Sequence, residues 1–143
     1  MERTPIVDAW SPAEIAVAIE SVGTKKVQAD TLTVLTLSVL AGAFISLGAA
    51  FYTVVVSDST LGLGVTRLLG GAAFSLGLIL VIVAGAELFT GNNLVAMAWA
   101  SRRVTGAELL RNWVLVYLGN VAGALAPANH LRVEVRPHGS LEG

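Results

Sequence analysis

The residues best suited to chemistry form one short segment, Glu87-Leu88-Phe89-Thr90-Gly91-Asn92-Asn93, which interrupts a long apolar stretch. It brings together a carboxylate, a hydroxyl and two side-chain amides. Gly91 and the two asparagines permit tight or left-handed backbone, so an irregular loop is expected here. Lipid cannot satisfy free backbone N–H and C=O groups, so a loop at membrane depth must be buried in protein or line a water-filled path.

Two side chains of this segment have alternative roles. Thr90 carries a hydroxyl that can donate a hydrogen bond to an anion, or bond back to its own helical turn. Glu87 is the only ionisable residue between positions 67 and 102, and a charge at mid-membrane is costly. We interpret Glu87 as an anchor of the loop that accepts hydrogen bonds inside the bundle, in preference to a role in transport.

The composition around this segment is typical of an all-α integral membrane protein. Of 143 residues, 55% are hydrophobic and only 13% are charged, and the mean hydropathy is +0.74; soluble domains carry roughly 25% charged residues. A formal net charge of −1 argues against a nucleic-acid partner. With no cysteine, no nucleophile–base pair and no metal cluster in the membrane segment, we expect neither an enzyme nor a cofactor or metal.

Three transmembrane elements are expected. Residues 31–56 carry no charge and exceed the roughly 20 residues needed to cross the hydrocarbon core. The second element runs over residues 68–86, breaks, and resumes over 94–100, a piece too short to cross alone. The third begins near Gly106 and is expected to end near Ala126.

Small residues mark the faces on which these helices can pack closely. Gly42, Ser46 and Ala50 are spaced four apart in the first element. Gly119 and Gly123 form a GxxxG pair in the third. Such spacing lets two helix backbones approach each other.

The ends of the chain are more polar than its middle. Residues 1–30 are expected to be a cytoplasmic segment in which a capping box at 11–14 starts an amphipathic helix, on the membrane surface or against the bundle, ending at Gly23. Residues 127–143 are expected to be a polar, solvated tail. Lysine and arginine precede the first element and follow the second. The positive-inside rule therefore predicts a multi-pass protein of the cell membrane with a cytoplasmic N-terminus.

The stretch Gly85-Ala86-Glu87-Leu88-Phe89-Thr90-Gly91-Asn92-Asn93 resembles the formate/nitrite transporter family, as do Phe74 to Leu78, Arg111-Asn112-Trp113 and Leu118 to Leu125. The resemblance covers about residues 12–126. It implies an aquaporin-like helical bundle whose second helix is broken by an Ω-shaped loop. It further implies a homo-pentamer with one pore in each protomer, which passes small monovalent anions such as formate or nitrite.

The resemblance also implies roles for individual residues. Phe74 and Leu78 match apolar positions of the pore constriction, Leu88 and Phe89 match the apolar gate of the loop, and Thr90 matches its polar pore contact. For Thr90 this favours the pore role. Without the resemblance, Phe74 and Leu78 would be interpreted as ordinary packing residues.

Members of the family have six helices in two inverted halves, so we expect this chain to supply the first half, in apparently truncated form. The tail after Pro127 has no counterpart in the pattern. Two alternatives remain. One is a membrane fragment or accessory subunit that transports nothing. A water or glycerol channel is less favoured, because Asn92-Asn93-Leu94 stands where an aquaporin has Asn-Pro-Ala.

Overall fold

The structure, a computed structural model, describes residues 10–134, and the regular elements among them are all α-helices. Their bounds are α1 Pro12–Gln28, α2 Thr31–Val56, α3 Leu63–Val83, α4 Phe89–Asn92, α5 Val95–Ala100 and α6 Gly106–Glu134. Three of them, α2, α3 and the Gly106–Asn129 part of α6, are long and apolar enough to cross a membrane. The predicted class, an all-α membrane protein, is confirmed.

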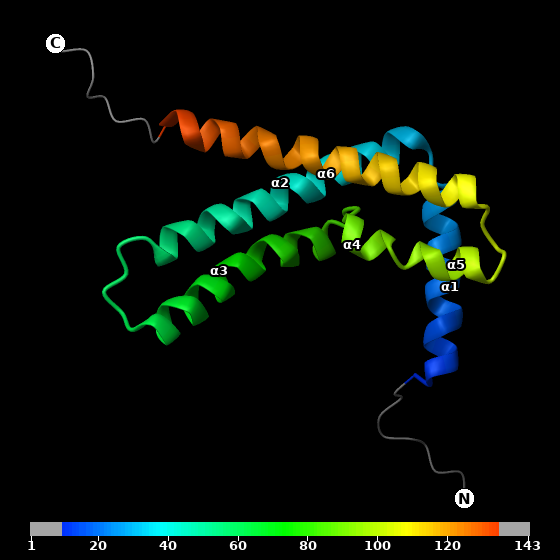
Figure 1. The fold of residues 1–143 in the computed structure, drawn as a ribbon, viewed down its shortest axis with the longest axis horizontal. Coiled ribbons are helices and arrows are strands. Elements are labelled where there is room, and N and C mark those ends of the chain that lie inside the picture. Colours follow the sequence, from blue (N-terminus) through cyan, green and yellow to red (C-terminus); the bar gives the residue numbers. More distant parts are fainter. Residues whose placement is uncertain (1–9, 135–143) are drawn as a thin grey trace, which may run out of the picture.

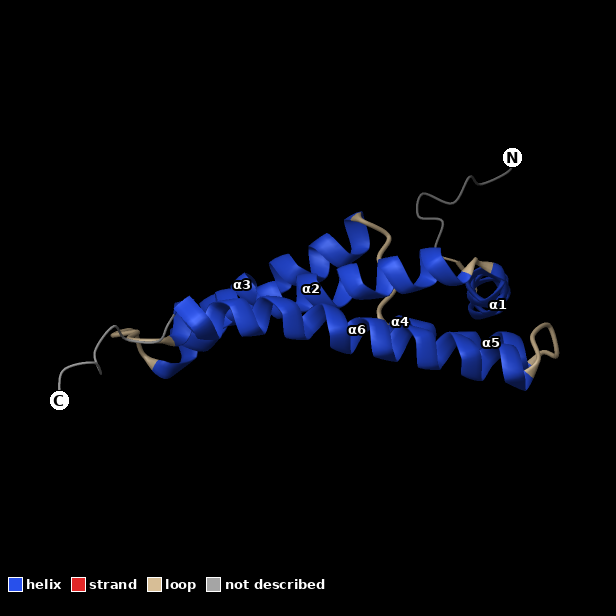
Figure 2. Ribbon diagram, turned by 90° about the horizontal axis from the view of Figure 1, so that it is seen from above, coloured by secondary structure: helices blue, strands red, loops and turns tan. Residues whose placement is uncertain are grey.

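The three long helices run along the long axis of the molecule, and α2 packs against both α3 and α6 (Figure 1). α4 and α5 continue from the end of α3, so α3, α4 and α5 form one interrupted element, as the sequence predicts. α1 lies across the end of this bundle and is seen end-on in Figure 2. It packs mainly on α5, so it lies against the bundle, one of its two expected positions.

α1 begins as predicted but ends later. The Ser11 hydroxyl accepts from the Glu14 amide at 3.3 Å, and the Glu14 carboxylate accepts from the hydroxyl and amide of Ser11, each at 2.7 Å. The hydrogen bond from the Ser11 hydroxyl, and to a smaller extent the one from the Ser11 amide, keep the pKa of Glu14 below its usual range. The predicted stop at Gly23 is wrong, since the helix continues to Gln28. A Cβ at Gly23 would lie 3.2 Å from the Cβ of Ala98, so this glycine serves close packing on α5.

α3 begins and ends earlier than the predicted residues 68–86. It starts at Leu63, where the Thr66 hydroxyl donates to the Leu61 carbonyl oxygen at 3.2 Å and so stabilises the first turn. The helix ends at Val83. Gly85 then adopts φ +63°, a backbone conformation that residues with a Cβ rarely take, and the chain turns out of the helix.

The predicted end of the third element near Ala126 is wrong, because α6 continues to Glu134. Pro127 lies inside the helix. A proline in a helix removes one backbone hydrogen bond and bends the helix, but helical turns on both sides can continue past it. The first part of the predicted tail 127–143 is therefore helical, and residues 135–143 lie outside the described residues.

Glycines set the distance between α2 and α6. A Cβ at Gly42 would lie 2.1 Å from the main-chain oxygen of Asn120, and one at Gly123 would lie 1.9 Å from that of Val39. At Gly119 the nearest atom would be the Cβ of Ser38, at 2.4 Å. No real Cβ tolerates such distances, so the two backbones are in direct contact here. The GxxxG pair of the third element therefore packs on α2, as small-residue spacing predicts.

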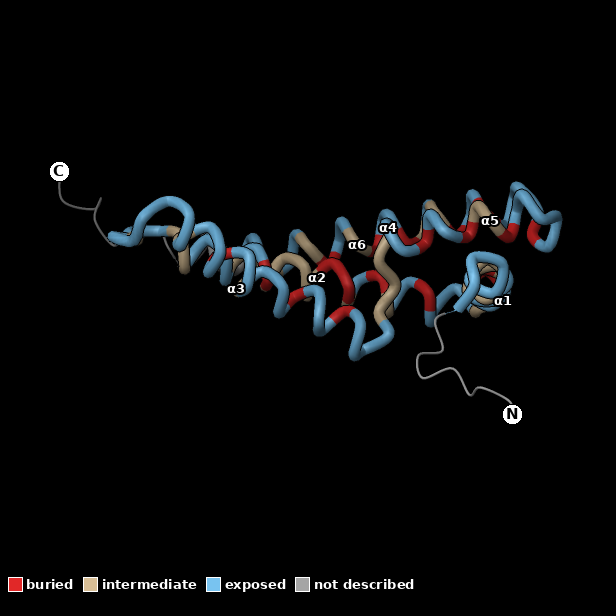
Figure 3. The backbone as a smooth tube through the Cα atoms, turned by 90° about the horizontal axis from the view of Figure 1, so that it is seen from below, coloured by how far each residue is buried: buried red, intermediate tan, exposed pale blue. Residues whose placement is uncertain are grey.

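Buried residues follow the faces where helices meet, whereas the outer faces of the long helices are exposed (Figure 3). Val54, Ile82 and Val83 are 74%, 71% and 79% exposed. A water-soluble monomer rarely exposes a contiguous apolar surface of this kind. Surfaces of this composition fit contact with lipid or with other membrane helices.

Gly123→Ala is expected to force α2 and α6 apart, because the added Cβ would meet the Val39 carbonyl oxygen. Thermal unfolding of the purified protein in detergent should lose its cooperative transition or shift it far down. Gly71→Ala is the matched control, since nothing lies within 4 Å of a Cβ there. It should unfold slightly higher than the parent, because alanine favours an exposed helix over glycine by about 1 kcal/mol. Similar transitions for the two variants would contradict the close contact.

Candidate functional site

The break between α3 and α4 is an ordered loop held by hydrogen bonds to its neighbours. The amides of Gly85 and Ala86 donate back to α3, to Ile82 O at 3.1 Å and Val81 O at 2.9 Å. The Glu87 amide then crosses to α2 and donates to Leu37 O at 3.2 Å. A helical carbonyl of α2 thus serves as acceptor for a loop that has left its own helix.

Asn120 of α6 clamps the same loop from the other side. Its Oδ1 accepts from the Phe89 amide at 2.9 Å, and its Nδ2 donates to Glu87 O at 2.9 Å. The same Nδ2 also donates to Ser38 O of α2 at 2.8 Å. One side-chain amide therefore ties together α2, α6 and the loop.

Asn92 holds the far end of the loop and is fully buried. Its Nδ2 donates to Asn112 Oδ1 at 3.0 Å, and its Oδ1 accepts from Lys26 Nζ at 3.0 Å. Its main-chain oxygen accepts from Trp113 Nε1 at 3.0 Å. Since all these partners lie on α1 and α6, the short helix α4 is fixed from two directions.

Glu87 and Lys26 form an ion pair at 2.5 Å, with side-chain exposures of 13% and 26%. Pairing lowers the cost of a carboxylate at this depth, because an opposite charge replaces part of the lost hydration. Sequence reasoning placed Glu87 in the loop but gave it no partner. The available signal was a lone carboxylate in an apolar stretch, which requires a cation, and a lysine pair, Lys25 and Lys26, at the end of the first helix.

A cleft of about 380 Å³ opens beside the loop. It collects three of the five predicted pore residues, namely Leu78 of α3, Leu88 of the loop and Thr90 of α4, together with Lys26. The remainder of its lining is apolar or glycine: Val81, Ile82, Gly85, Ala86 and Gly91. The cleft thus combines apolar walls with one hydroxyl and one cation, and Thr90 is exposed in it.

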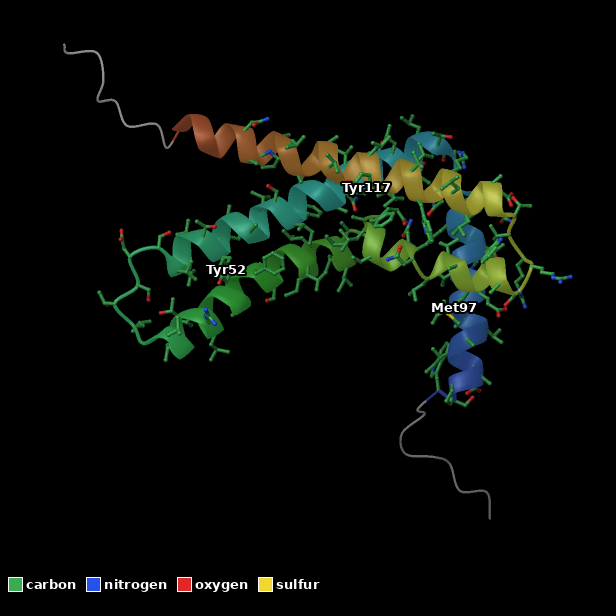
Figure 4. All side chains as sticks on the ribbon, in the orientation of Figure 1. Tyr52, Met97 and Tyr117 are labelled. Atoms are coloured by element: carbon green, nitrogen blue, oxygen red, sulfur yellow. The ribbon has the colours of Figure 1, made fainter. Side chains whose placement is uncertain are left out.

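The other two predicted pore residues do not line this cleft. The Phe89 ring packs edge-on against α6, 6.2 Å from the Trp113 ring and 5.7 Å from the Tyr117 ring; Tyr117 is labelled in Figure 4. Phe74 lies one helical turn before Leu78 on α3 and is 38% exposed. Phe89 therefore contacts α6 on the opposite side of the loop from Leu88 and Thr90.

The remaining predicted loop residues have different positions. Gly91 and Asn92 lie in α4, and Asn93 is its C-cap residue with φ −60° and ψ −27°, so the expected irregular backbone at these three positions is wrong. The left-handed residue of the break is Gly85. Gly91 lines the cleft, and Asn93 is exposed. Among the described side chains, which end at residue 129, no group of three or more His, Cys, Asp or Glu is arranged to hold a metal ion.

Comparison with known proteins gives one consistent result. The family described as formate/nitrite transporter matches residues 13–134, so the match continues past Ala126 into the last turns of α6. The formate channel FocA of Escherichia coli (strain K12) is 43% identical over 119 residues, which cover 82% of this chain and 42% of that protein. The uncharacterized transporter YrhG of Bacillus subtilis (strain 168) is 45% identical over 116 residues, covering 80% and 44%.

A probable formate transporter of Methanothermobacter thermautotrophicus is 37% identical over 127 residues, which cover 86% of this chain and 46% of that protein. This chain therefore spans less than half the length of these curated relatives.

Lys26→Met is expected to destabilise the protein by about 3 kcal/mol, because it leaves the Glu87 carboxylate buried without its cation. Lys26→Met combined with Glu87→Gln should lose much less than the sum of the two single variants. Chemical unfolding of all four proteins in detergent measures the coupling. Lys25→Met is the control, since Lys25 is exposed on the same helix. Additive losses would show that the pair contributes no coupling.

Proposed function

Because the chain belongs to the formate/nitrite transporter family, we propose that it forms the loop-bearing wall of a path for small monovalent anions across a membrane. The family is one of transporters, which agrees with the expectation that the chain is not an enzyme. The observation that carries the proposal is the cleft at the broken helix, where Thr90 and Lys26 meet the apolar side chains of Leu78 and Leu88.

The chemistry of the cleft suits passage better than tight binding. An anion that enters must shed water between Leu78 and Leu88, and the Thr90 hydroxyl can replace part of the lost hydration. The Leu88 and Thr90 amides have no acceptor among the groups that the structure describes, so they too can donate. Lys26 is already paired with Glu87, so the net electrostatic attraction on an anion in the cleft is weak. Conduction needs a site that an ion can leave as readily as it enters.

The substrate class follows from the named relatives. Two of the three described above are named for formate, and we propose formate or a similar small monovalent anion, such as nitrite, as the substrate of this chain. We further propose that the path is completed by a part corresponding to the rest of those relatives, and that the protein assembles as a homo-oligomer, by resemblance a pentamer. No cofactor enters this proposal.

Phe74 and Phe89 do not line the cleft, and in this proposal they act through neighbouring residues that do. Phe74 extends the apolar face of Leu78 along α3, toward the α2–α3 connection. Phe89 is fixed by the rings of Trp113 and Tyr117. That contact holds the backbone at Phe89, between Leu88 and Thr90, in place. Phe89 would line a pore only if its ring left α6.

Thr90→Val keeps the shape of the side chain and removes the hydroxyl. It is expected to lower formate uptake about tenfold or more, the effect of losing one hydrogen bond to a charged group. Uptake is measured in proteoliposomes holding this chain fused to the part of the Escherichia coli formate channel that it does not match. Thr90→Ser restores the hydroxyl and should transport like the parent, and immunoblots confirm equal protein in the vesicles. Unchanged uptake by Thr90→Val would remove Thr90 from the path.

The proposed orientation has a cytoplasmic N-terminus in the cell membrane, and α2–α3 and α5–α6 connections on opposite sides. A cysteine at Thr60 should react with an impermeant maleimide on intact cells, because Thr60 is exposed in the α2–α3 connection. A cysteine at Arg102, exposed in the α5–α6 connection, should react only after the membrane is opened. The reverse pattern would overturn the orientation.

A further inference from the structure

Leu88 has the backbone of a β-strand residue although it stands between helices. Its φ is −98° and its ψ is 132°. The two groups that flank it, Glu87 C=O and Phe89 N–H, both bond to the side-chain amide of Asn120, at 2.9 Å each. A neighbouring β-strand pairs in this way, accepting from one side of a residue and donating to the other. Asn120 therefore acts as a one-residue strand partner for Leu88.

The local chain does not supply this support by itself. Leu88 occupies the N-cap position of α4, and no side-chain bond caps that helix. The Phe89 amide is one of the donors that a helix start leaves unpaired, and its acceptor comes from α6. Without Asn120, neither the amide of Phe89 nor the carbonyl of Glu87 has another partner among the described backbone and side-chain groups.

Asn120 is itself held in position by the packing of α6 on α2. Gly119 and Gly123 bring the two backbones into contact on either side of it, and its Nδ2 also donates to Ser38 O. Asparagine has a short side chain with few rotamers. The amide therefore reaches the loop only because the glycines bring its helix so near.

We propose that Asn120 is the positioning residue that fixes the direction of the Leu88 side chain at the cleft, and so determines how large an anion can pass. This specificity role rests on the proposed function. The pairing holds the peptide groups on both sides of Leu88, which leaves its side chain directed into the cleft that it lines with Leu78 and Thr90. Asn120 does not line the cleft and acts through Leu88.

Hydrogen exchange tests the positioning role on this chain without any transport. Asn120→Ala should speed exchange of the Phe89 amide about tenfold, the loss of one ordinary hydrogen bond, while amides in the middle of α2 keep their protection. The readout is residue-resolved amide exchange by NMR in detergent micelles. Asn93→Ala is the matched control, because Asn93 is exposed at the C-terminal end of α4, four residues after Phe89. Unchanged exchange at Phe89 in Asn120→Ala overturns the positioning role.

The specificity role is tested with the fused transporter, as the ratio of acetate uptake to formate uptake. Asn120→Ala should raise this ratio severalfold, and Asn93→Ala should leave it unchanged. Leu88→Ala should raise it as well while leaving Phe89 exchange slow, because it shortens the side chain without touching the clamp. A constant ratio in Leu88→Ala would by itself overturn the specificity role, so the proposal can still be tested if Asn120→Ala assembles poorly.

Each outcome has a distinct meaning. A ratio that stays constant in Asn120→Ala, or in Leu88→Ala, overturns the specificity role. A fused parent with no formate uptake overturns the proposed function and the specificity role with it, whereas the exchange measurement still decides the positioning role. Faster Phe89 exchange together with a raised ratio supports both parts of the proposal.

Discussion

A helix that breaks inside a membrane leaves backbone N–H and C=O groups that lipid cannot satisfy, and most of this structure serves that constraint. The loop after α3 bonds two of its amides back to α3 and one to a carbonyl of α2, while Asn120 and Trp113 of α6 pair with Glu87 O, Phe89 N and Asn92 O. No single neighbouring helix could satisfy all of these groups. The break can exist only where α1, α2 and α6 converge on it.

The close approach of α2 and α6 is also required if the polar groups of the loop are to find partners. Longer side chains at Gly42, Gly119 or Gly123 would separate the helices, and an asparagine would then no longer span the gap to the loop. A glutamine could reach farther, but its additional torsion would fix the loop less well. The glycine contacts and the Asn120 bonds are therefore one mechanism, in which backbone contact sets the position of a side chain.

How much could be predicted from the sequence depended on whether a feature is local. The span 31–56, the break near Glu87 and the start of α6 follow from charge-free runs, loop-forming residues and a capping box, each readable within a few neighbouring residues. Helix ends were harder. Gly23 was expected to stop a helix and Pro127 to lie beyond one, yet contact with α5 and turns on both sides of the proline extend both helices.

Partners across helices were not predictable in the same way. Glu87 and Lys26 are separated by 61 positions, and their meeting depends on how α1 crosses the bundle. Likewise, nothing in the sequence indicated that the Phe89 ring would contact Trp113 and Tyr117. In a helix that is apolar on most sides, small residues such as Gly119 and Gly123 mark one packing face, but nothing in the sequence says which larger side chains meet on the other faces.

The anchors of the loop lie on both sides of it along the chain, and this bears on how the protein is made. Lys26 and Leu37 are synthesised before the loop, whereas Asn112, Trp113 and Asn120 emerge from the ribosome after it. The broken helix therefore meets the membrane before α6 exists, with several polar groups still lacking partners. Until α6 arrives, those groups must form hydrogen bonds with water or with the insertion machinery. The loop thus takes its final form only after α6 has arrived.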